Sequence, residues 1–280
     1  MIVLDGGALT QALNFLKLDS AFTNMRLHFP SAFKKWTAAM ILLSPLVSRL
    51  KADEPMAPAV AISLQRGSFD TYHFVPPGPP KAIILFGSGD GGWGPVENRV
   101  CACMQQNGFY TVGIDFRKYA MTNYDSDTLV SDFAVIAADA GERAGNAELP
   151  VIYGGWSMGA VQAVAACAGA DLRSPSLVGL VLMSMDQRGR YGLGLPEQIG
   201  LEPEGEGTFG VADFTAAVAN LKVVQLSAVG DWMNNTDWIK TLKTPHRLYE
   251  LQHSNHDFNG ADDALQQVFL DGIKWILNLG

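Results

Sequence analysis

The stretch Val151-Ile152-Tyr153-Gly154-Gly155-Trp156-Ser157-Met158-Gly159-Ala160 decides how this chain of 280 residues folds. Its apolar first half predicts a buried strand, and the small residues after it predict a helix from Met158 to Ala168. Ser157 lies between them in the pattern Gly-x-Ser-x-Gly, which is typical of a sharp turn that exposes the serine hydroxyl. Glycines are required at 155 and 159 because side chains there would collide with the neighbouring strand and helix. The stretch therefore predicts a sheet with a candidate nucleophile, Ser157, at the end of one strand.

Short apolar strands alternate with helical patterns on both sides of this turn. We expect strands at Phe69 to Val75, Ala82 to Phe86, Tyr110 to Ile114, Leu177 to Met183, Leu221 to Leu226 and His246 to Leu251. We expect helices at Pro95 to Asn107, Thr128 to Ala144 and Ala264 to Leu277. This order predicts the α/β-hydrolase fold, a mostly parallel sheet with helices on both faces. The stretch from Asp186 to Ala212 is rich in Gly, Pro and charge, and we expect it to be a short lid-like insertion.

The first 52 residues differ in character from the rest of the chain. Lys34-Lys35, the apolar stretch Trp36 to Val47, and small and polar residues up to Ala52 follow the order of an export signal. The apolar run is too short to span a bilayer. We expect a signal peptide or uncleaved anchor at about 25–52, within an N-terminal extension 1–52, and one hydrolase domain at 53–280. The protein is then periplasmic or otherwise exported; the alternative is an amphipathic helix and a cytoplasmic protein.

Composition limits the classes of partner. Lys and Arg number 20 against 28 Asp and Glu, so the formal charge of −8 and the lack of a basic stripe exclude nucleic acid. The cysteines Cys101, Cys103 and Cys167 are too few for a disulfide framework, and we expect buried thiols. A Cys101–Cys167 or Cys103–Cys167 bridge is the alternative in an oxidising compartment. No metal and no cofactor are expected, because neither H-E-x-x-H nor G-x-x-x-x-G-K-[ST] occurs.

A serine that transfers acyl groups needs a base and a carboxylate that orients the base. His256 is the candidate base, because it lies in a polar loop between the last strand and the closing helix. Asp231 is the candidate acid, because it follows a strand in a Gly-Asp turn and gives the chain order Ser, Asp, His. The alternatives are His253 for the base, and Asp186 and Asp237 for the acid.

The negative charge that develops on the substrate needs N–H donors. Met158 begins the helix after the serine, so its N–H is one candidate donor. The second donor should come from the glycine-rich loop after the strand Ala82 to Phe86. Gly89 and Asp90 are the two candidates, and the sequence does not choose between them.

The segment Ser88-Gly89-Asp90-Gly91-Gly92-Trp93 after a buried strand resembles the bacterial virulence protein family VirJ/AcvB. The likeness continues in Val112-Gly113-Ile114-Asp115 with Tyr119, in Ser157 with Gly159-Ala160, and in His256-Asp257-Phe258. It covers roughly residues 80–165, and in the last third of the chain only the histidine loop. The resemblance implies a periplasmic α/β-hydrolase of a family whose characterised members hydrolyse the lysyl ester of lysyl-phosphatidylglycerol. It also implies that Ser157 and His256 occupy the triad positions of that family.

The residues and the resemblance together predict a serine hydrolase that cleaves a carboxylic ester through an acyl-enzyme. If the substrate is an aminoacylated phospholipid, peripheral contact with a membrane is expected, and Asp90 would pair with the cationic aminoacyl part. Further candidate substrate-binding residues are Trp93, Arg188 and Arg190, of which Arg188 or Arg190 would pair with the phosphate. The alternatives are a turn role for Asp90, solvated loop charges for the arginines, a general carboxylesterase or thioesterase, and a non-catalytic binding protein linked to secretion or virulence.

Overall fold

The structure is a computed structural model that describes residues 57–169, 173–194 and 201–279. The extension 1–52, with the expected signal or anchor, lies outside the described residues, as does the segment 195–200 of the expected insertion. Within the described ranges, none of the helices combines the length and the apolar character needed to cross a bilayer.

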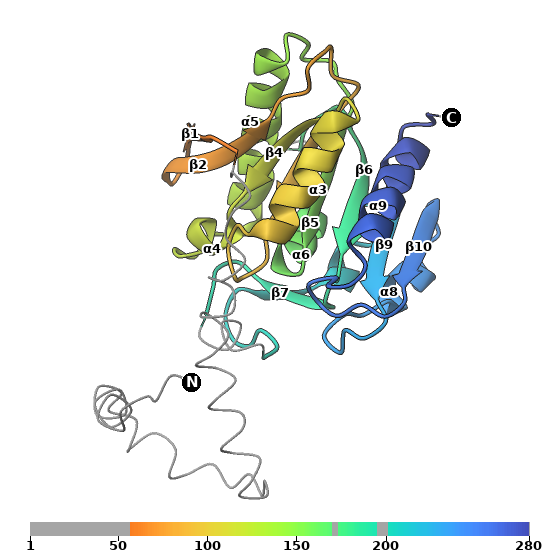
Figure 1. Cartoon of the computed structure of the whole chain (residues 1–280). Coiled ribbons are helices and arrows are strands. Elements are labelled where there is room, and N and C mark those ends of the chain that lie inside the picture. The colour runs from red at the N-terminus through yellow and green to blue at the C-terminus, as the bar shows by residue number, and fades with distance from the viewer. Residues whose placement is uncertain (1–56, 170–172, 195–200, 280) are drawn as a thin grey trace, which may run out of the picture. The chain divides into compact units, whose positions relative to one another are not determined.

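One large sheet organises the described part of the chain (Figure 1), with its strands in the order β1-β2-β4-β3-β5-β6-β9-β10. The strands are β1 (Ala59–Leu64), β2 (Gly67–Phe74), β3 (Ile83–Gly87), β4 (Tyr110–Ile114), β5 (Val151–Trp156), β6 (Leu177–Met183), β9 (Lys222–Ala228) and β10 (His246–Leu251). β2 pairs antiparallel with β1 and β4, and all other neighbouring pairs are parallel. Since the parallel strands end at one edge, the loops after β3, β5, β6, β9 and β10 meet there.

Helices cover both faces of the sheet (Figure 1). Helices α5 (Ser126–Arg143) and α6 (Met158–Ala165) pack on one face, and α3 (Pro95–Gln106) and α9 (Asp262–Ile276) pack on the other. Each face therefore has its own apolar core. This arrangement confirms the fold that the alternation of strands and helices predicts.

Strand β3 shows why the central strands are apolar along their whole length. Ile83 and Leu85 belong to the core beneath α5 and α6, whereas Ile84 and Phe86 belong to the core beneath α3 and α9. Successive side chains of a strand point to opposite faces, so a strand covered on both faces shows no apolar–polar alternation.

The predicted strands at Tyr110–Ile114, Leu177–Met183 and His246–Leu251 have the bounds that the sequence indicates. Strand β1 was not predicted, because as the edge strand its side chains are mostly exposed and give a weak apolar signal. The short helix α8 (Asp237–Thr241) was also missed, and α6 ends at Ala165 rather than at Ala168. A single turn carries too little periodicity to be recognised in a sequence.

The predicted insertion forms, in its described part, a two-stranded ribbon followed by the 3-10 turn η1 (Val211–Phe214). The ribbon is β7 (Arg188–Arg190) paired antiparallel with β8 (Thr208–Gly210). It packs on α6, since a Cβ placed on Gly189 would lie 2.5 Å from Cγ1 of Val161. The ribbon is thereby anchored to the helix that follows Ser157.

The three cysteines are free thiols, and the sheet separates them. Cys101 and Cys103 lie on the side of α3 and α9, whereas Cys167 belongs to the core beneath α5 and α6. Neither the Cys101–Cys167 nor the Cys103–Cys167 bridge can form in this fold, so that alternative is wrong. Burial raises the pKa of the Cys101 and Cys167 thiols, which keeps both protonated and unreactive.

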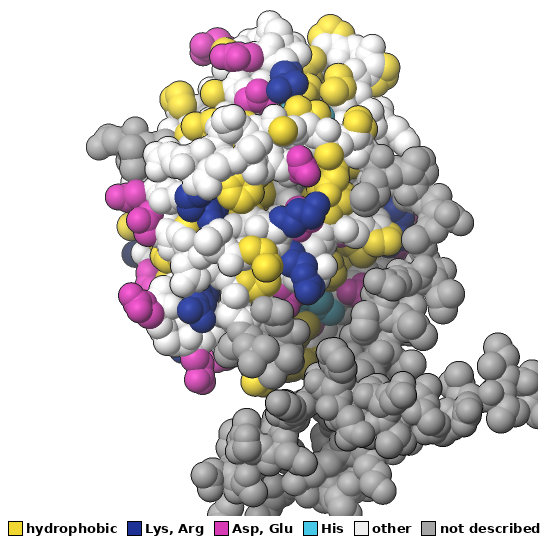
Figure 2. All heavy atoms as spheres, turned by 90° about the vertical axis from the view of Figure 1, so that its left-hand side faces the viewer, with side chains coloured by type: hydrophobic (Ala, Val, Ile, Leu, Met, Phe, Trp, Pro, Cys, Tyr) yellow, Lys and Arg dark blue, Asp and Glu magenta, His cyan; other side chains and the backbone are white. Residues whose placement is uncertain are grey.

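One face of the described chain is shown in Figure 2, turned so that the left-hand side of Figure 1, with β1 and β2, faces the viewer. Basic and acidic side chains are interspersed there with apolar ones. Such a surface offers no continuous basic patch for a phosphate backbone on this face.

Gly179 of β6 leaves no room for a side chain, since a Cβ there would lie 2.6 Å from Cγ2 of Ile276 and 2.7 Å from the Lys222 carbonyl oxygen. We expect Gly179→Ala to lower the free energy of unfolding by about 1–3 kcal/mol, because the strand oxygen cannot move without disturbing the sheet. Thermal unfolding measures the change. In the control Gly78→Ala the new Cβ meets nothing within 4 Å, so its Tm should stay close to wild type. Equal Tm values for the two variants would contradict this packing.

Candidate active site

Ser157 lies between β5 and α6 in a conformation that residues with side chains rarely adopt, with φ 53° and ψ −119°. The turn is held by close contacts between backbones. A Cβ on Gly155 would collide with the backbone of Gly159, and a Cβ on Gly159 would collide with the carbonyl group of Gly87. Both glycines are therefore required, as the sequence predicts. A strained, partly exposed serine of this kind is typical of functional sites.

The imidazole of His256 is hydrogen-bonded to Asp231, with 2.8 Å between Nδ1 and Oδ2. An ionised carboxylate only accepts, so Nδ1 carries the hydrogen and Nε2 keeps its lone pair free. The side chain of Asp231 is 0% exposed and that of His256 is 21% exposed. The structure thus brings together the two residues that the sequence proposes as acid and base.

The surroundings of Asp231 keep its carboxyl ionised. Burial by itself would raise the pKa, but the hydrogen bond and charge of His256 and the N–H of Met233, 3.0 Å from Oδ1, outweigh it. The hydroxyl of Ser184 also lowers the pKa, although it makes no hydrogen bond of standard geometry. The pKa of Asp231 therefore lies below its ordinary value, and the carboxylate is available to orient the imidazole.

Two backbone hydrogen bonds hold the Asp231 loop against the His256 loop. The N–H of Val229 donates to the Leu251 carbonyl at 3.0 Å, and the N–H of Gly230 donates to the Ser254 carbonyl at 2.9 Å. A Cβ on Gly230 would lie 2.6 Å from that Ser254 oxygen. The glycine before Asp231 is thus required by the close approach of the two loops.

Trp156 links the serine turn to the histidine loop, a role that the sequence analysis missed. Its Nε1 donates to the backbone carbonyl of His256 at 3.0 Å, and the two rings lie 5.2 Å apart between centroids. Among the described residues no hydrogen bond joins Ser157 to His256 directly, and the indole of Trp156 links the two segments. The sequence signal that could have indicated this role is the aromatic residue at the variable position before the serine in Gly-x-Ser-x-Gly.

The glycine-rich loop after β3 lies directly against the serine. A Cβ on Gly89 would lie 3.5 Å from Cβ of Ser157 and 3.4 Å from Cε3 of Trp156. Ser88 fixes the start of this loop, because its Oγ accepts the N–H of Phe116 at 3.0 Å. The N–H of Met158, at the start of α6, has no acceptor in the described part of the chain. The start of α6 and the glycine-rich loop therefore both adjoin Ser157, where an oxyanion site needs its donors.

The competing residues are not part of this hydrogen-bonded pair. Asp237 is exposed and forms an ion pair with Lys240 at 3.6 Å, and His253 is exposed in the left-handed region with φ 56°. Asp186 accepts the N–H of Gln187 at 2.6 Å and makes no hydrogen bond to His256. Asp231, rather than Asp186 or Asp237, is therefore the carboxylate that orients the imidazole.

Two carboxyl groups nevertheless lie within electrostatic range of His256. Burial raises the pKa of Asp186, with further contributions from the negative charges of Glu202 and Asp231, and His256 opposes the shift. Burial also raises the pKa of Asp90, opposed by the positive charge of His256, the N–H of Gly91 and, more weakly, Arg117. Neither carboxylate forms a salt bridge within the described residues.

The side chain of Trp93 packs against the core beneath α3 and α9. Its ring stacks on Tyr72, with centroids 4.8 Å apart and an interplanar angle of 24°, and it covers Gly113, where any Cβ would collide with it. Trp93 therefore supports the glycine-rich loop from the core, and its expected role in substrate binding stays a prediction.

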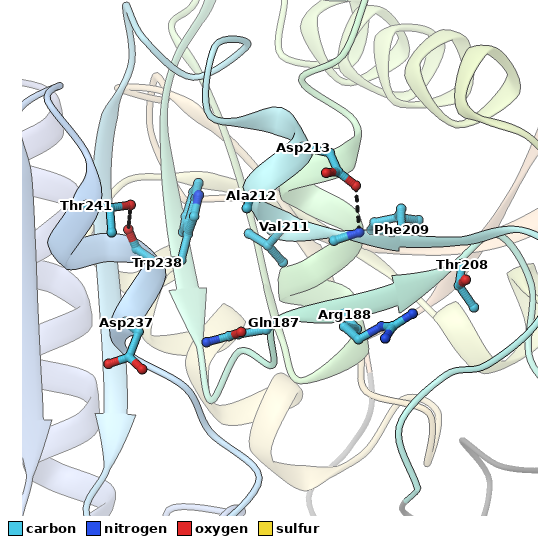
Figure 3. Close-up of a pocket in the computed structure, with 11 residues that line it drawn as sticks. Gln187, Arg188, Thr208, Phe209, Val211, Ala212, Asp213, Asp237, Trp238 and Thr241 are labelled. Atoms are coloured by element: carbon cyan, nitrogen blue, oxygen red, sulfur yellow. Dashed lines mark hydrogen bonds between the residues drawn. The ribbon is translucent and has the colours of Figure 1, made fainter.

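A pocket of about 560 Å³ lies between the ribbon and α8 (Figure 3). Its wall contains Arg188 and Gln187 on one side and Asp237 and Trp238 on the other. Arg188 is exposed, so it is available to a ligand there. Arg190 instead belongs to the anchored part of the ribbon, where its carbonyl accepts Nε2 of Gln162 at 2.8 Å.

Comparison with known proteins agrees with this fold. One similar structure is Est1E from Butyrivibrio proteoclasticus, at 12% identity and TM-score 0.60, with 79% of this chain and 100% of that chain covered. Another is the esterase domain of a Rhodothermus marinus protein, at 14% identity and TM-score 0.57, with 80% of this chain and 99% of that chain covered. A third is dienelactone hydrolase from Anabaena variabilis, at 21% identity and TM-score 0.56, with 80% of this chain and 99% of that chain covered. These likenesses show the α/β-hydrolase fold. No curated protein sequence matches the chain significantly. The family model "Bacterial virulence protein (VirJ)" matches residues 81–276, and the chain therefore belongs to the VirJ family.

Proposed function

We propose that the protein is a serine esterase in which Ser157 is the nucleophile, His256 the base and Asp231 the residue that orients the base. The observation that carries this proposal is the 2.8 Å hydrogen bond between His256 and Asp231 in the loops beside the strained serine turn. A turn with a purely structural role would need neither the strain at Ser157 nor an ionised carboxylate behind an imidazole.

The reaction proceeds through an acyl-enzyme. Oγ of Ser157 attacks the ester carbonyl carbon while its proton passes to Nε2 of His256, and the N–H of Met158 with one from the glycine-rich loop stabilises the oxyanion. The bond to the alcohol oxygen then breaks, and that oxygen takes the proton from His256. Water attacks the acyl-enzyme with His256 again as the base, which releases the carboxylic acid and restores the serine.

Charge around the nucleophile favours a cationic acyl group. Asp90 and Asp186 are both half-buried and lie within electrostatic range of His256, with no salt bridge in the described ranges. A protonated amino group on the acyl part would compensate these charges. We therefore propose an aminoacyl ester as the substrate, and specifically the lysyl ester of lysyl-phosphatidylglycerol, since the lysyl group carries two ammonium groups.

The alcohol part of such a substrate carries a phosphodiester. Arg188, in the wall of the pocket beside the ribbon, supplies a guanidinium group for the phosphodiester. Only Gln187 separates Arg188 from Asp186 in the sequence. A lipid substrate also agrees with the export signal expected at about 25–52 and with peripheral contact between the protein and the membrane.

Assays with two different esters test the type of reaction and the identity of the natural substrate separately. We expect the purified protein to hydrolyse lysyl-phosphatidylglycerol and, more slowly, a short-chain p-nitrophenyl ester. Ser157→Ala should reduce both rates by about 10³-fold or more, since the nucleophile acts together with its base. Lysine release and nitrophenolate absorbance are the measurements. Lipid hydrolysis that survives Ser157→Ala would rule out the mechanism, whereas hydrolysis of the nitrophenyl ester alone would rule out the lipid assignment.

Charge recognition is tested with lysyl and norleucyl p-nitrophenyl esters, which differ in the side-chain ammonium group. We expect Asp90→Asn and Asp186→Asn each to lower kcat/KM for the lysyl ester by about 10-fold or more relative to the norleucyl ester, because a charge-assisted contact is lost. Asp237→Asn, at an exposed position, is the matched control and should leave the ratio unchanged. A constant ratio in all three variants would show that these carboxylates do not select the acyl group.

A further inference from the structure

Glu97, in the first turn of α3, is an acidic residue that the proposed mechanism does not use. Its side chain is inside the protein, with 0% exposure. Oε2 accepts the N–H of Gly94 at 3.1 Å, and Oε1 has no hydrogen-bond partner among the described residues. A glutamate at this position commonly caps a helix with one oxygen, and capping does not require burial. Capping alone therefore does not account for an enclosed carboxyl with an unpaired oxygen.

This carboxyl lies behind the oxyanion loop, by which we mean residues 88–93. Gly94, whose N–H donates to Glu97, directly follows the loop. Within the loop, the N–H of Gly89 lowers the pKa of the Glu97 carboxyl. On its other side Gly89 lies against Ser157, since a Cβ placed on Gly89 would lie 3.5 Å from Cβ of the serine. Gly89 thus lies between the buried carboxyl and Ser157. The choice between Gly89 and Asp90 as the second oxyanion donor stays open, because the N–H of Asp90 acts in turn on its own carboxyl.

The groups around Glu97 leave its charge uncompensated. Burial raises the pKa of Glu97 to about 7, the N–H groups of Glu97, Gly89 and Gly94 oppose the shift, and the negative charge of Asp115 adds to it. Cys101, one turn further along α3, also faces Glu97, whose charge raises the pKa of the thiol. Asp115, the charged neighbour that acts most strongly on Glu97, is acidic and therefore does not compensate the charge of the carboxylate. Glu97 is therefore neutral in mildly acid solution and becomes a buried anion above neutral pH.

We propose that Glu97 is a positioning residue for the oxyanion loop: the neutral acid holds the loop in its active form, and the carboxylate disables it. In the charged state the carboxylate attracts the N–H of Gly89 and places a negative charge behind the site where the oxyanion forms. In a site of low dielectric both effects oppose the transition state. This inference rests on the proposed esterase activity.

The experiment measures kcat and KM for a p-nitrophenyl ester between pH 5.5 and 9, corrected for spontaneous hydrolysis. In the wild type kcat should fall about 10-fold or more above neutral pH, with KM nearly constant, as expected when oxyanion stabilisation is lost. Glu97→Gln keeps an acceptor for the Gly94 N–H and cannot ionise, so its kcat should stay within about 3-fold of wild type at pH 6 and lack the alkaline decrease. Glu97→Ala should lose about 10- to 100-fold in kcat at every pH.

Glu142→Gln on the exposed face of α5 makes the same charge change and should keep the wild-type profile. An alkaline decrease that persists in Glu97→Gln, or a wild-type kcat in Glu97→Ala, would overturn the inference while leaving the esterase proposal intact. A wild type without activity would refute the esterase proposal and with it the catalytic part of this inference.

Thermal unfolding tests the buried charge without any substrate. A carboxyl whose pKa is higher in the folded than in the unfolded state stabilises the fold at low pH, and that stabilisation is lost as the pH rises from about 4.5 to about 7. The Tm of the wild type should therefore fall over this range relative to that of Glu97→Gln. Parallel Tm profiles for the two proteins would show that Glu97 does not ionise as proposed.

Discussion

The site depends on the contact of three backbone segments that have no side chain between them. A Cβ on Gly155, at the end of β5, would collide with the carbonyl carbon of Gly159 in the first turn of α6. A Cβ on Gly159 would collide with the carbonyl oxygen of Gly87 at the end of β3. This contact forces the conformation of Ser157 and also sets the starting point of the oxyanion loop, which leaves β3 at Gly87. Ser157 and the start of the glycine-rich loop are therefore placed by the same contact.

Order along the chain was sufficient to predict which loops meet. Parallel strands carry their following loops to one edge, so the serine, aspartate and histidine of the sequence analysis had to approach one another once the sheet was recognised. The pairing of Asp231 with His256 follows from this topology and from Gly230, whose lack of a side chain allows the two loops to touch. The sequence favoured Asp231 but could not exclude Asp186 and Asp237, because that choice depends on where each loop turns.

Features that depend on the packing of side chains were not predicted. Trp156 faces the histidine loop, and Trp93 faces the core, yet both are aromatic residues beside glycines, and only the path of the chain distinguishes them. Glu97 is part of an ordinary helix start in the sequence, and its enclosure by the oxyanion loop is visible only in the structure. Neither residue type nor spacing encodes how deeply a polar group is buried.

The positions of the cysteines bear on how this chain reaches its folded state. With Cys101 in one core and Cys167 in the other, and the sheet between them, the native structure contains no pair of thiols that oxidation could join. Folding therefore proceeds to the same end point in a reducing and in an oxidising compartment, and it requires no disulfide catalyst. No disulfide contributes to the stability of the described fold, so denatured protein can be refolded with a reductant present throughout.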